Sequence, residues 1–344
     1  MKESPPKVLL FSDTQMLEHE TGSGHWEQSA RLRNVQGYFE AHPVHGAQWT
    51  AVTPATRTAL ARVHTAAYLD HLETLDGQAA QLDPDTPISA GSIRAAKHAV
   101  GAAVAMVDAA FGSATPRGFA LIRPPGHHAL AGAAMGFCLF NNVAIAAAHA
   151  QAVYGCKRIL IVDWDVHHGN GTQDIFEESA EVLVFNAHRA PFYPGTGAVE
   201  DVGKGAGAGF SVNVALPEAV GDGDYVAAFK RILLPIAETF CPELVLVSAG
   251  FDAHQEDPIG GMQVTDDGFA SLCGLVTAIA DRYANGRIGL VLEGGYNVEA
   301  LTRSAAACVN VLAGHVAPDA PKAGGRADAA AAQTVAAQRT FWPL

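Results

Sequence analysis

The chain of 344 residues has few charged side chains, and most of those are acidic. Asp, Glu, Lys and Arg make up 17% of the sequence, and 35 acidic against 22 basic residues give a formal net charge of −13. Proteins that bind nucleic acid neutralise phosphates with Lys and Arg, so this balance argues against a nucleic-acid partner and suits a cationic one. Hydrophobic residues make up 49%, which excludes wholesale disorder and indicates a soluble globular chain.

Cysteine and long apolar runs are also scarce. The five cysteines are odd in number and scattered without a Cys-x-x-Cys pair, which argues against a disulfide framework and against a thiolate metal site. No apolar run reaches about 18 residues, and the start, MKESPPKVLL, lacks the long apolar segment of a secretory signal. We therefore expect no membrane association and a cytoplasmic location.

Short apolar runs rich in Val, Ile and Leu recur along the chain and are typical of strands buried on both faces of a parallel sheet. They lie at 7–11, 118–122, 157–162, 182–185, 243–247 and 287–292, with 210–216 as a further candidate. Ala-rich segments with helical spacing lie at 92–111, 143–154, 224–240, 268–283 and 298–312. This alternation predicts an α/β fold. We expect one domain over 1–314 and a weakly ordered tail, rich in Ala, Gly and Pro, over 315–344.

Polar residues gather where four of these predicted strands end. The run to Ile122 leads into RPPGHH, the run to Val162 into DWDVHHGNG, the run to Val247 into SAGFD, and the run to Leu292 into EGGY. In open parallel sheets, ligands bind outside the carboxyl ends of the strands, where the connecting loops converge. We therefore expect two His-His pairs, three aspartates and a tyrosine to meet at one edge of the sheet.

The segment after Val162 indicates a metal site. Side chains alternate along an extended strand, so Asp163, Asp165 and His167 project to one side. Buried carboxylates need cations or strong donors, and Asp165, His167 and Asp252 would leave a position open for water, as in a catalytic zinc site. Such a donor set does not exclude Fe²⁺. The alternative is structural: the aspartates accept backbone hydrogen bonds and His167 is a packed histidine.

Together, these motifs resemble those of the histone deacetylase superfamily of zinc-dependent deacetylases, which includes acetylpolyamine amidohydrolases. RPPGHH, GFCLFNN, DWDVHHGNG, PGTG, SAGFD and LEGGY occur in the family's order between about Gly24 and Leu312. Asn170 stands where class I members have Asp, so the sequence is more similar to the class II branch. The resemblance implies a single α/β domain of the arginase/deacetylase type, an open parallel eight-stranded sheet flanked by helices.

The resemblance assigns the chemistry to two sets of residues. The zinc ligands would be Asp165, His167 and Asp252. The residues that act on the substrate, or that hold those residues, would be His128, His127, Tyr296, Asp163 and Asn170. In this second set, His128 would be the general base and acid, with His127 as its electrostatic partner. Tyr296 would donate to the substrate oxygen, while Asp163 would hold His127 and Asn170 would orient His128.

A third set would surround the substrate. Phe137 and Tyr193 would form the walls of a narrow acyl-lysine channel and Gly136 its floor. Arg31 would lie beneath the zinc. Asp85 would hold a peptide substrate at the rim, although an ordinary turn residue is the alternative there.

The family also binds K⁺, and the resemblance implies two such sites. One would involve Asp163, Asp165, His167 and the segment 186–187, where Asn186 replaces a serine of class I members. The other would use backbone carbonyls of Phe176, Ser179 and Val182.

These features predict a zinc-dependent amidohydrolase that removes acetyl or related acyl groups from the ε-amine of lysine in proteins or peptides. The alternative substrate is an acetylated polyamine. Ile259 stands where one group of polyamine-acting relatives carries a Glu, which favours acyl-lysine. A catalytically silent acyl-lysine binder is a further alternative, but His128, Tyr296 and all three ligands are present. The sequence does not predict the oligomeric state.

Overall fold

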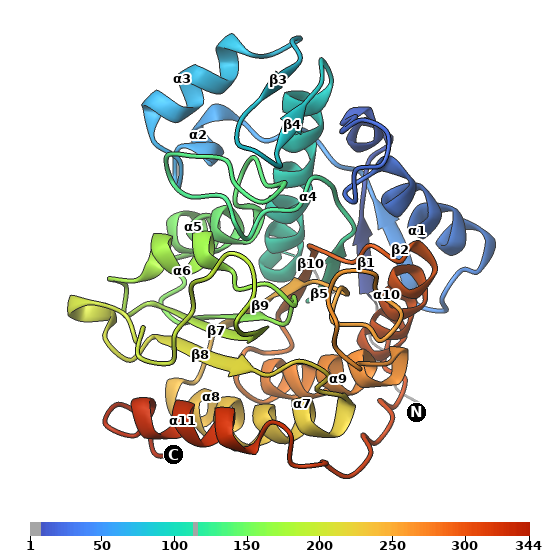
Figure 1. Ribbon diagram of the computed structural model, residues 1–344. Coiled ribbons are helices and arrows are strands. Elements are labelled where there is room, and N and C mark those ends of the chain that lie inside the picture. The colour runs from blue at the N-terminus through green and yellow to red at the C-terminus, as the bar shows by residue number, and fades with distance from the viewer. Residues whose placement is uncertain (1–7, 113–115) are drawn as a thin grey trace.

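The computed structural model describes residues 8–112 and 116–344. At its centre lies an eight-stranded sheet in the order β2-β1-β5-β10-β9-β6-β7-β8, with every neighbouring pair parallel (Figure 1). Its strands are β1 (Val8–Phe11), β2 (Ala47–Thr50), β5 (Arg117–Ala120), β6 (Ile159–Asp163), β7 (Val182–Arg189), β8 (Ser211–Leu216), β9 (Leu244–Ala249) and β10 (Ile288–Leu292). A separate antiparallel pair consists of β3 (Ala80–Gln81) and β4 (Pro87–Ile88). The predicted α/β fold with a parallel eight-stranded sheet is confirmed.

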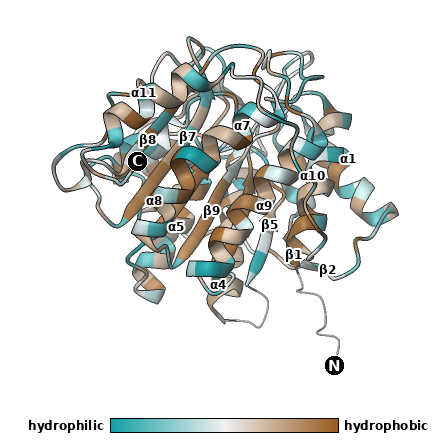
Figure 2. Cartoon of the chain, turned by 90° about the horizontal axis from the view of Figure 1, so that it is seen from below, coloured by the Kyte–Doolittle hydropathy of each residue, from teal (hydrophilic) through white to brown (hydrophobic). Residues whose placement is uncertain are grey.

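The central strands are apolar because helices cover both of their faces. Every residue of β6, β9 and β10 is buried, and Figure 2 shows β9 and its neighbours in brown among more hydrophilic helices. Strands buried on both sides read as continuous apolar runs rather than alternating ones. Burial of each Val, Leu or Ile side chain contributes about 1.5–3 kcal/mol, so this layer supplies much of the folding free energy.

Two groups of helices cover the sheet. In the first group, α4 (Ser92–Gly112) packs on β1, β5 and β10, and α5 (Asn142–Tyr154) packs on α4 and β9. In the second, α9 (Asp266–Tyr283) packs on β9, and α10 (Val298–Leu312) packs on β5 and on α1 (Ser29–Ala41). The other helices are η1 (Thr14–Glu18), α2 (Arg57–Leu60), α3 (Ala66–Thr74), α6 (Asn170–Phe176), η2 (Gly205–Gly207), α7 (Asp222–Ala228), η3 (Phe229–Leu233), α8 (Leu234–Phe240) and α11 (Asp328–Gln338). None of the helices within the described ranges has the length and apolar character needed to cross a membrane.

The apolar runs in the sequence predicted seven of the eight strands of this sheet but not β2. This strand has the sequence AQWT, lies at the edge of the sheet, and is at most half-buried, so it lacks the apolar run used to recognise the others. The predicted helix over 224–240 is α7 and α8 joined by the π-helical turn η3. Residue 7, assigned to the first predicted strand, lies outside the described residues.

The segment after Gly314 differs from the weakly ordered tail that its composition suggested. It contains α11, which lies along the edge strand β8 (Figure 1). Three buried donors bond to alternate carbonyls beside or within that strand: Thr334 Oγ1 to Asn213 at 2.7 Å, Gln338 Nε2 to Ser211 at 2.6 Å, and Trp342 Nε1 to Gly209 at 2.7 Å. The donors are four residues apart and their acceptors two residues apart. Four residues of a helix rise about 6 Å and two residues of a strand about 6.6 Å, so the spacing of the donors matches that of the carbonyls. The division into 1–314 and 315–344 stays a prediction.

Candidate active site

Four neighbouring strands, β5, β10, β9 and β6, carry the predicted site residues at their carboxyl ends. Asp163 is the last residue of β6, and Asp165 and His167 follow it. Asp252 follows β9, and Tyr296 follows β10. The loop after β5 supplies the His127–His128 pair. The predicted convergence at one sheet edge follows from the parallel order of these strands.

Asp165, His167 and Asp252 form a compact buried cluster. One potential ligand atom from each lies within 4.8 Å of the other two. His167 Nδ1 is 3.0 Å from Asp165 Oδ1 and 3.2 Å from Asp252 Oδ2. Asp252 Oδ1 accepts a hydrogen bond from the backbone N–H of Val166 at 2.8 Å. Within the part of the chain that the structure describes, Asp252 Oδ2 has no hydrogen-bond partner.

The electrostatics of this cluster favour a bound cation. Burial and the nearby Asp165 raise the pKa of Asp252 to about 7. Burial opposes a charge on His167, but the carboxylates of Asp165 and Asp252 outweigh it and raise the pKa of His167 to about 10. Two buried carboxylates therefore attract positive charge onto the imidazole of His167. Two carboxylates and one imidazole are donors that fit a divalent cation such as Zn²⁺ or Fe²⁺.

His127 and His128 pack closely, with their rings tilted at 42°, but their pKa values shift in opposite directions. Their ring centroids are 4.0 Å apart, and His127 Nδ1 lies 2.9 Å from Asp163 Oδ2. Burial opposes charge on His127, but Asp163 and Asp165 keep its pKa well above the usual range. Burial, with the positive charge of His127 and His167 beside it, keeps the pKa of His128 well below the usual range. The pair therefore combines one charged and one neutral imidazole.

Asn170 fixes the tautomer of His128. Its Oδ1 lies 2.7 Å from His128 Nδ1, while its Nδ2 donates to the sulfur of Met135. An amide oxygen can only accept, so Nδ1 of His128 carries the proton and Nε2 presents a lone pair. A neutral histidine in this state can accept a proton. Asn170 is the first residue of α6, so the loop after β6 leads to this residue and also supplies two of the three predicted metal ligands, Asp165 and His167.

Tyr296 lies in a loop whose backbone is anchored by two buried groups. Arg31 donates through Nε to Gly295 O at 2.7 Å and through Nη2 to the carbonyl of Glu293. Its guanidinium carbon also lies 5.2 Å from the centre of the Tyr296 ring. Gly294 N donates to Asp165 Oδ2 at 2.9 Å, which ties this loop to the metal cluster. The structure thus places Arg31 and Tyr296 in contact.

Aromatic side chains flank the cluster. Phe137 packs edge-on against Tyr296, with ring centroids 6.0 Å apart, and Tyr193 packs edge-on against His128 at 5.2 Å. Gly136 has φ +56°, and a Cβ there would lie 2.5 Å from the His128 ring. Glycine is therefore required at this position for both backbone conformation and space.

Asp85 lies beside the Phe137 segment. Its carbonyl is 3.2 Å from His25 Nε2, and the next residue, Thr86, accepts the Phe137 N–H through Oγ1 at 3.0 Å. Burial and the adjacent Asp83 carboxylate raise the pKa of Asp85 to about 6. Among the other predicted substrate-side residues, Gly136 and Tyr193 adjoin His128, whereas Phe137 and Arg31 adjoin Tyr296.

Asn186 is a buried polar side chain that the described residues leave unsatisfied. It is 1% exposed, and neither atom of its amide has a hydrogen-bond partner among residues 8–112 and 116–344. It lies opposite Asp163 in the register of β6 and β7. Burying a polar group without a hydrogen bond costs free energy, so this amide needs a polar partner.

Sequence reasoning gave no role to several buried acids around the site. Glu293 accepts from the backbone N–H of Gly126 at 2.6 Å and from Ser248 Oγ at 3.0 Å. Glu27 is fully buried and forms ion pairs with Arg31 at 3.0 Å and with Arg123 at 2.7 Å. Glu293 could have been noticed because it directly follows an apolar strand. Glu27 carried no such signal, because it follows no apolar run and its partner Arg123 is 96 positions away in the chain.

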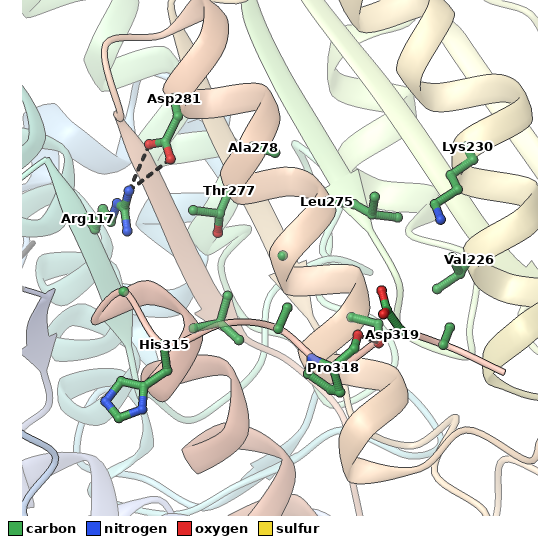
Figure 3. Close-up of a pocket in the computed structure, with 16 residues that line it drawn as sticks. Arg117, Val226, Lys230, Leu275, Thr277, Ala278, Asp281, His315, Pro318 and Asp319 are labelled. Atoms are coloured by element: carbon green, nitrogen blue, oxygen red, sulfur yellow. Dashed lines mark hydrogen bonds and ion pairs between the residues drawn. The ribbon is translucent and has the colours of Figure 1, made fainter.

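The structure also has a pocket of about 490 Å³ at the other end of the strands (Figure 3). Arg117, which opens β5, pairs there with Asp281, and His315 and Asp319 lie on the segment that crosses α9. The predicted catalytic, metal and substrate residues do not line this pocket. The predicted site residues lie instead at the carboxyl ends of the strands.

Comparison with known proteins agrees with the motifs. The family described as Histone deacetylase domain matches residues 25–312. The chain is 39% identical to Histone deacetylase 15 of Arabidopsis thaliana, covering 98% of this chain and 61% of that protein. It is 38% identical to the Histone deacetylase-like amidohydrolase of Pseudomonas aeruginosa (85% of this chain, 78% of that one). It is also 47% identical to the human Polyamine deacetylase HDAC10 (72% and 37%).

A solved structure supports the same relationship. The crystal structure of the HDA15 HD domain superimposes with a TM-score of 0.91 at 38% identity, covering 98% of this chain and 96% of that one. The chain thus spans about three fifths of the curated plant relative and nearly all of the solved domain. Sequence motifs, fold and family match agree along most of the chain, and the protein belongs to the histone deacetylase family.

Proposed function

We propose that this protein is a metal-dependent deacetylase that hydrolyses the amide of an acetylated or otherwise acylated amine. The observation that carries the proposal is the buried Asp165–His167–Asp252 cluster beside a neutral His128 and an anchored Tyr296. The histone deacetylase family match and the deacetylase names of its relatives support it. A silent binder would not need a complete set of acid–base groups around its metal site.

The residues of the cluster would hold Zn²⁺, with Fe²⁺ as the other candidate. A bound divalent cation supplies a Lewis acid that polarises the amide carbonyl and lowers the pKa of water. Asp165, His167 and Asp252 fit this role because their potential ligand atoms lie within 4.8 Å of one another and the two buried carboxylates favour a cation. A K⁺ ion near Asn186 and Asp163 would be coordinated by the unpartnered Oδ1 of Asn186, and a second at the 176–182 carbonyls follows from the family resemblance.

His128 would move the proton. With Nδ1–H bonded to Asn170, its Nε2 can take a proton from the attacking water and return it to the departing amine. His127, held by Asp163, would supply positive charge next to the developing negative charge without itself exchanging a proton. The low pKa of His128 keeps it in the base form at neutral pH.

Tyr296 would stabilise the oxygen of the scissile carbonyl. Burial keeps the pKa of its hydroxyl well above the usual range, so the hydroxyl stays protonated and can donate. Arg31 beneath it fixes the loop through two carbonyls. Phe137 and Tyr193 would exclude water from the two sides of an extended substrate chain, over a floor kept open by Gly136.

We propose ε-acyl-lysine in proteins or peptides as the substrate, with acetylated polyamines as the second candidate. Ile259 in place of a gating carboxylate favours lysine, whereas similarity to a polyamine deacetylase favours the second candidate. Asp85 would hold a peptide at the rim. Either substrate leaves a cationic product amine, which agrees with the net charge of −13. A cytoplasmic location stays a prediction.

Turnover by the metal-reconstituted protein tests the proposal. An acetyl-lysine reporter peptide and N-acetylspermidine are assayed with the wild type, Tyr296→Phe and His128→Ala, with Tyr283→Phe on α9 as a matched control. We expect losses in kcat of about 10²–10³-fold for Tyr296→Phe and about 10²–10⁴-fold for His128→Ala. Full rates in both variants, or no turnover of either substrate by the zinc-loaded wild type, would overturn it. A higher kcat/KM for acetylspermidine would assign the polyamine substrate.

A further inference from the structure

The loop that carries Tyr296 meets a single carboxylate on its outer side. Asp257 Oδ2 accepts from the backbone N–H of Tyr296 at 2.7 Å and from that of Asn297 at 3.3 Å. On the inner side, Arg31 holds the preceding two carbonyls, at Glu293 and Gly295. Gly294 N also donates to Asp165, so the backbone around Tyr296 is fixed by one guanidinium and two carboxylates, of which Asp257 alone binds the N–H of Tyr296.

The second oxygen of Asp257 organises its own loop. Oδ1 accepts from the backbone N–H of Ile259 at 2.9 Å and from that of Gly260 at 3.1 Å. Gly260 packs so closely on the carbonyl of Asp252 that a Cβ at this position would collide with it. One side chain thus connects the loop of Tyr296 to the loop that carries a proposed metal ligand.

Only a carboxylate fits this position. Four N–H groups converge on two oxygens, and an ionised Asp is acceptor-only with room for about four hydrogen bonds. Asn could satisfy one pair of N–H groups, but its amide nitrogen would point donors at the other pair. Hydrogen bonds to a charged acceptor are roughly twice as strong as neutral ones, so this contact orders both loops firmly.

We propose that Asp257 is a positioning residue for the reaction, which holds the Tyr296 hydroxyl at the distance from the Asp165–His167–Asp252 cluster that the substrate oxygen requires. This inference rests on the proposed function, because it needs Tyr296 to donate to the substrate. Among the described residues, the hydrogen bonds of the Asp257 carboxylate all come from backbone N–H groups, and none joins it to the metal cluster or to the Tyr296 side chain. It acts by placing another group, and its removal should affect turnover more than binding.

A double-mutant cycle distinguishes positioning from a general structural role. The kinetic constants, bound metal and melting temperature are measured for Asp257→Asn, Tyr296→Phe and the double variant, all in the full-length, zinc-loaded protein. Asp257→Glu is a second variant, which keeps the charge but displaces the oxygens by one methylene. Asp222→Asn is the matched control, because Asp222 also joins two segments through Thr265 N at 2.8 Å and Thr265 Oγ1 at 2.7 Å, but away from Tyr296.

We expect Asp257→Asn to lower kcat about 10²-fold, the loss that a displacement of about 1 Å can cause. KM and metal content should stay close to the wild-type values. In the Tyr296→Phe background the same substitution should cost less than about 2-fold, because residues that act through one another are not additive. Asp257→Glu should also lower kcat, and Asp222→Asn should leave it unchanged.

Three results would overturn the proposal: an unchanged kcat in both Asp257 variants, an equal loss from Asp257→Asn with and without the Tyr296 hydroxyl, or a loss of kcat that follows loss of metal. These differ from failure of the proposed function. If Tyr296→Phe alone retains the wild-type rate, the role of Tyr296 in the proposed function is wrong, and the positioning role of Asp257 is refuted with it. If Tyr296→Phe is impaired but the losses add, only the inference about Asp257 is wrong.

Discussion

Replacing Asn170 by Asp should make His128 more basic and shift the pH dependence of turnover. The two side chains meet at 2.7 Å between His128 Nδ1 and Asn170 Oδ1. The substitution keeps the acceptor and adds one negative charge. An opposite charge at such a distance raises a histidine pKa by about 1–3 pH units. Since His128 acts as a base only when neutral, the acidic limb of kcat/KM should move to higher pH by the same amount.

The assay is the pH profile of kcat/KM on an acetyl-lysine reporter for the zinc-loaded wild type and Asn170→Asp. Asn170 opens α6, where an added carboxylate suits the helix dipole, so the variant should fold. Gln173→Glu is the matched control, because Gln173 lies in the same helix but contacts His168 and Asn213 instead of His128. An unchanged acidic limb in Asn170→Asp, or the same displacement in Gln173→Glu, would refute the reasoning.

Three further predictions concern stability. Burial lowers the pKa of His64 to about 4, so the folded state binds fewer protons than the unfolded state between pH 6.5 and 4. The contribution of neutral His64 to the free energy of unfolding should be full above pH 6.5. It should fall by about 3 kcal/mol as the pH drops through this window. Burial also lowers the pKa values of His19, His168 and His188, so His64→Gln should keep part of the pH slope. Urea unfolding should show a fall that is about 3 kcal/mol smaller in His64→Gln than in the wild type, and equal slopes would contradict the prediction. Chelation should lower the melting temperature, and zinc at 100 times its Kd should restore about 2.7 kcal/mol; a melting temperature independent of zinc would count against the metal site. Gln338→Ala should cost about 1–3 kcal/mol by leaving the Ser211 carbonyl unpaired, while the exposed Gln333→Ala should cost little; equal midpoints in urea would exclude the edge contact as a stabilising one.

The grouping of the site could be predicted because its signals are local. Asp165 and His167 are two residues apart at the end of an apolar strand, and the parallel-sheet rule then brings Asp252 to the same edge. The structure places the three potential ligand atoms within 4.8 Å of one another. Their roles in catalysis remain a proposal, which the experiments above test.

Other parts of the site depend on tertiary packing that the sequence does not display. Glu27 pairs with Arg123 across 96 positions of the chain, and no local sequence pattern links the two residues. Asp257 reads as a common turn residue before Pro258, and its four N–H donors come from two loops that meet only in the folded sheet. Similarly, β2 and α11 lie at the sheet edges, where the apolar pattern is weakest or depends on one partner strand.

The order of strands has a consequence for how the protein is made. Strands β1, β2 and β5 form one side of the sheet, β6, β7 and β8 form the other, and β9 and β10 lie between them although they come last in the chain. During synthesis from the N-terminus, the first 243 residues therefore contain both flanks without the strands that join them. Asp165 and His167 leave the ribosome before Asp252 and Tyr296. The proposed site residues can therefore come together only after the last two strands have been synthesised and have paired with both flanks, so a chain that ends before β9 lacks part of the proposed site.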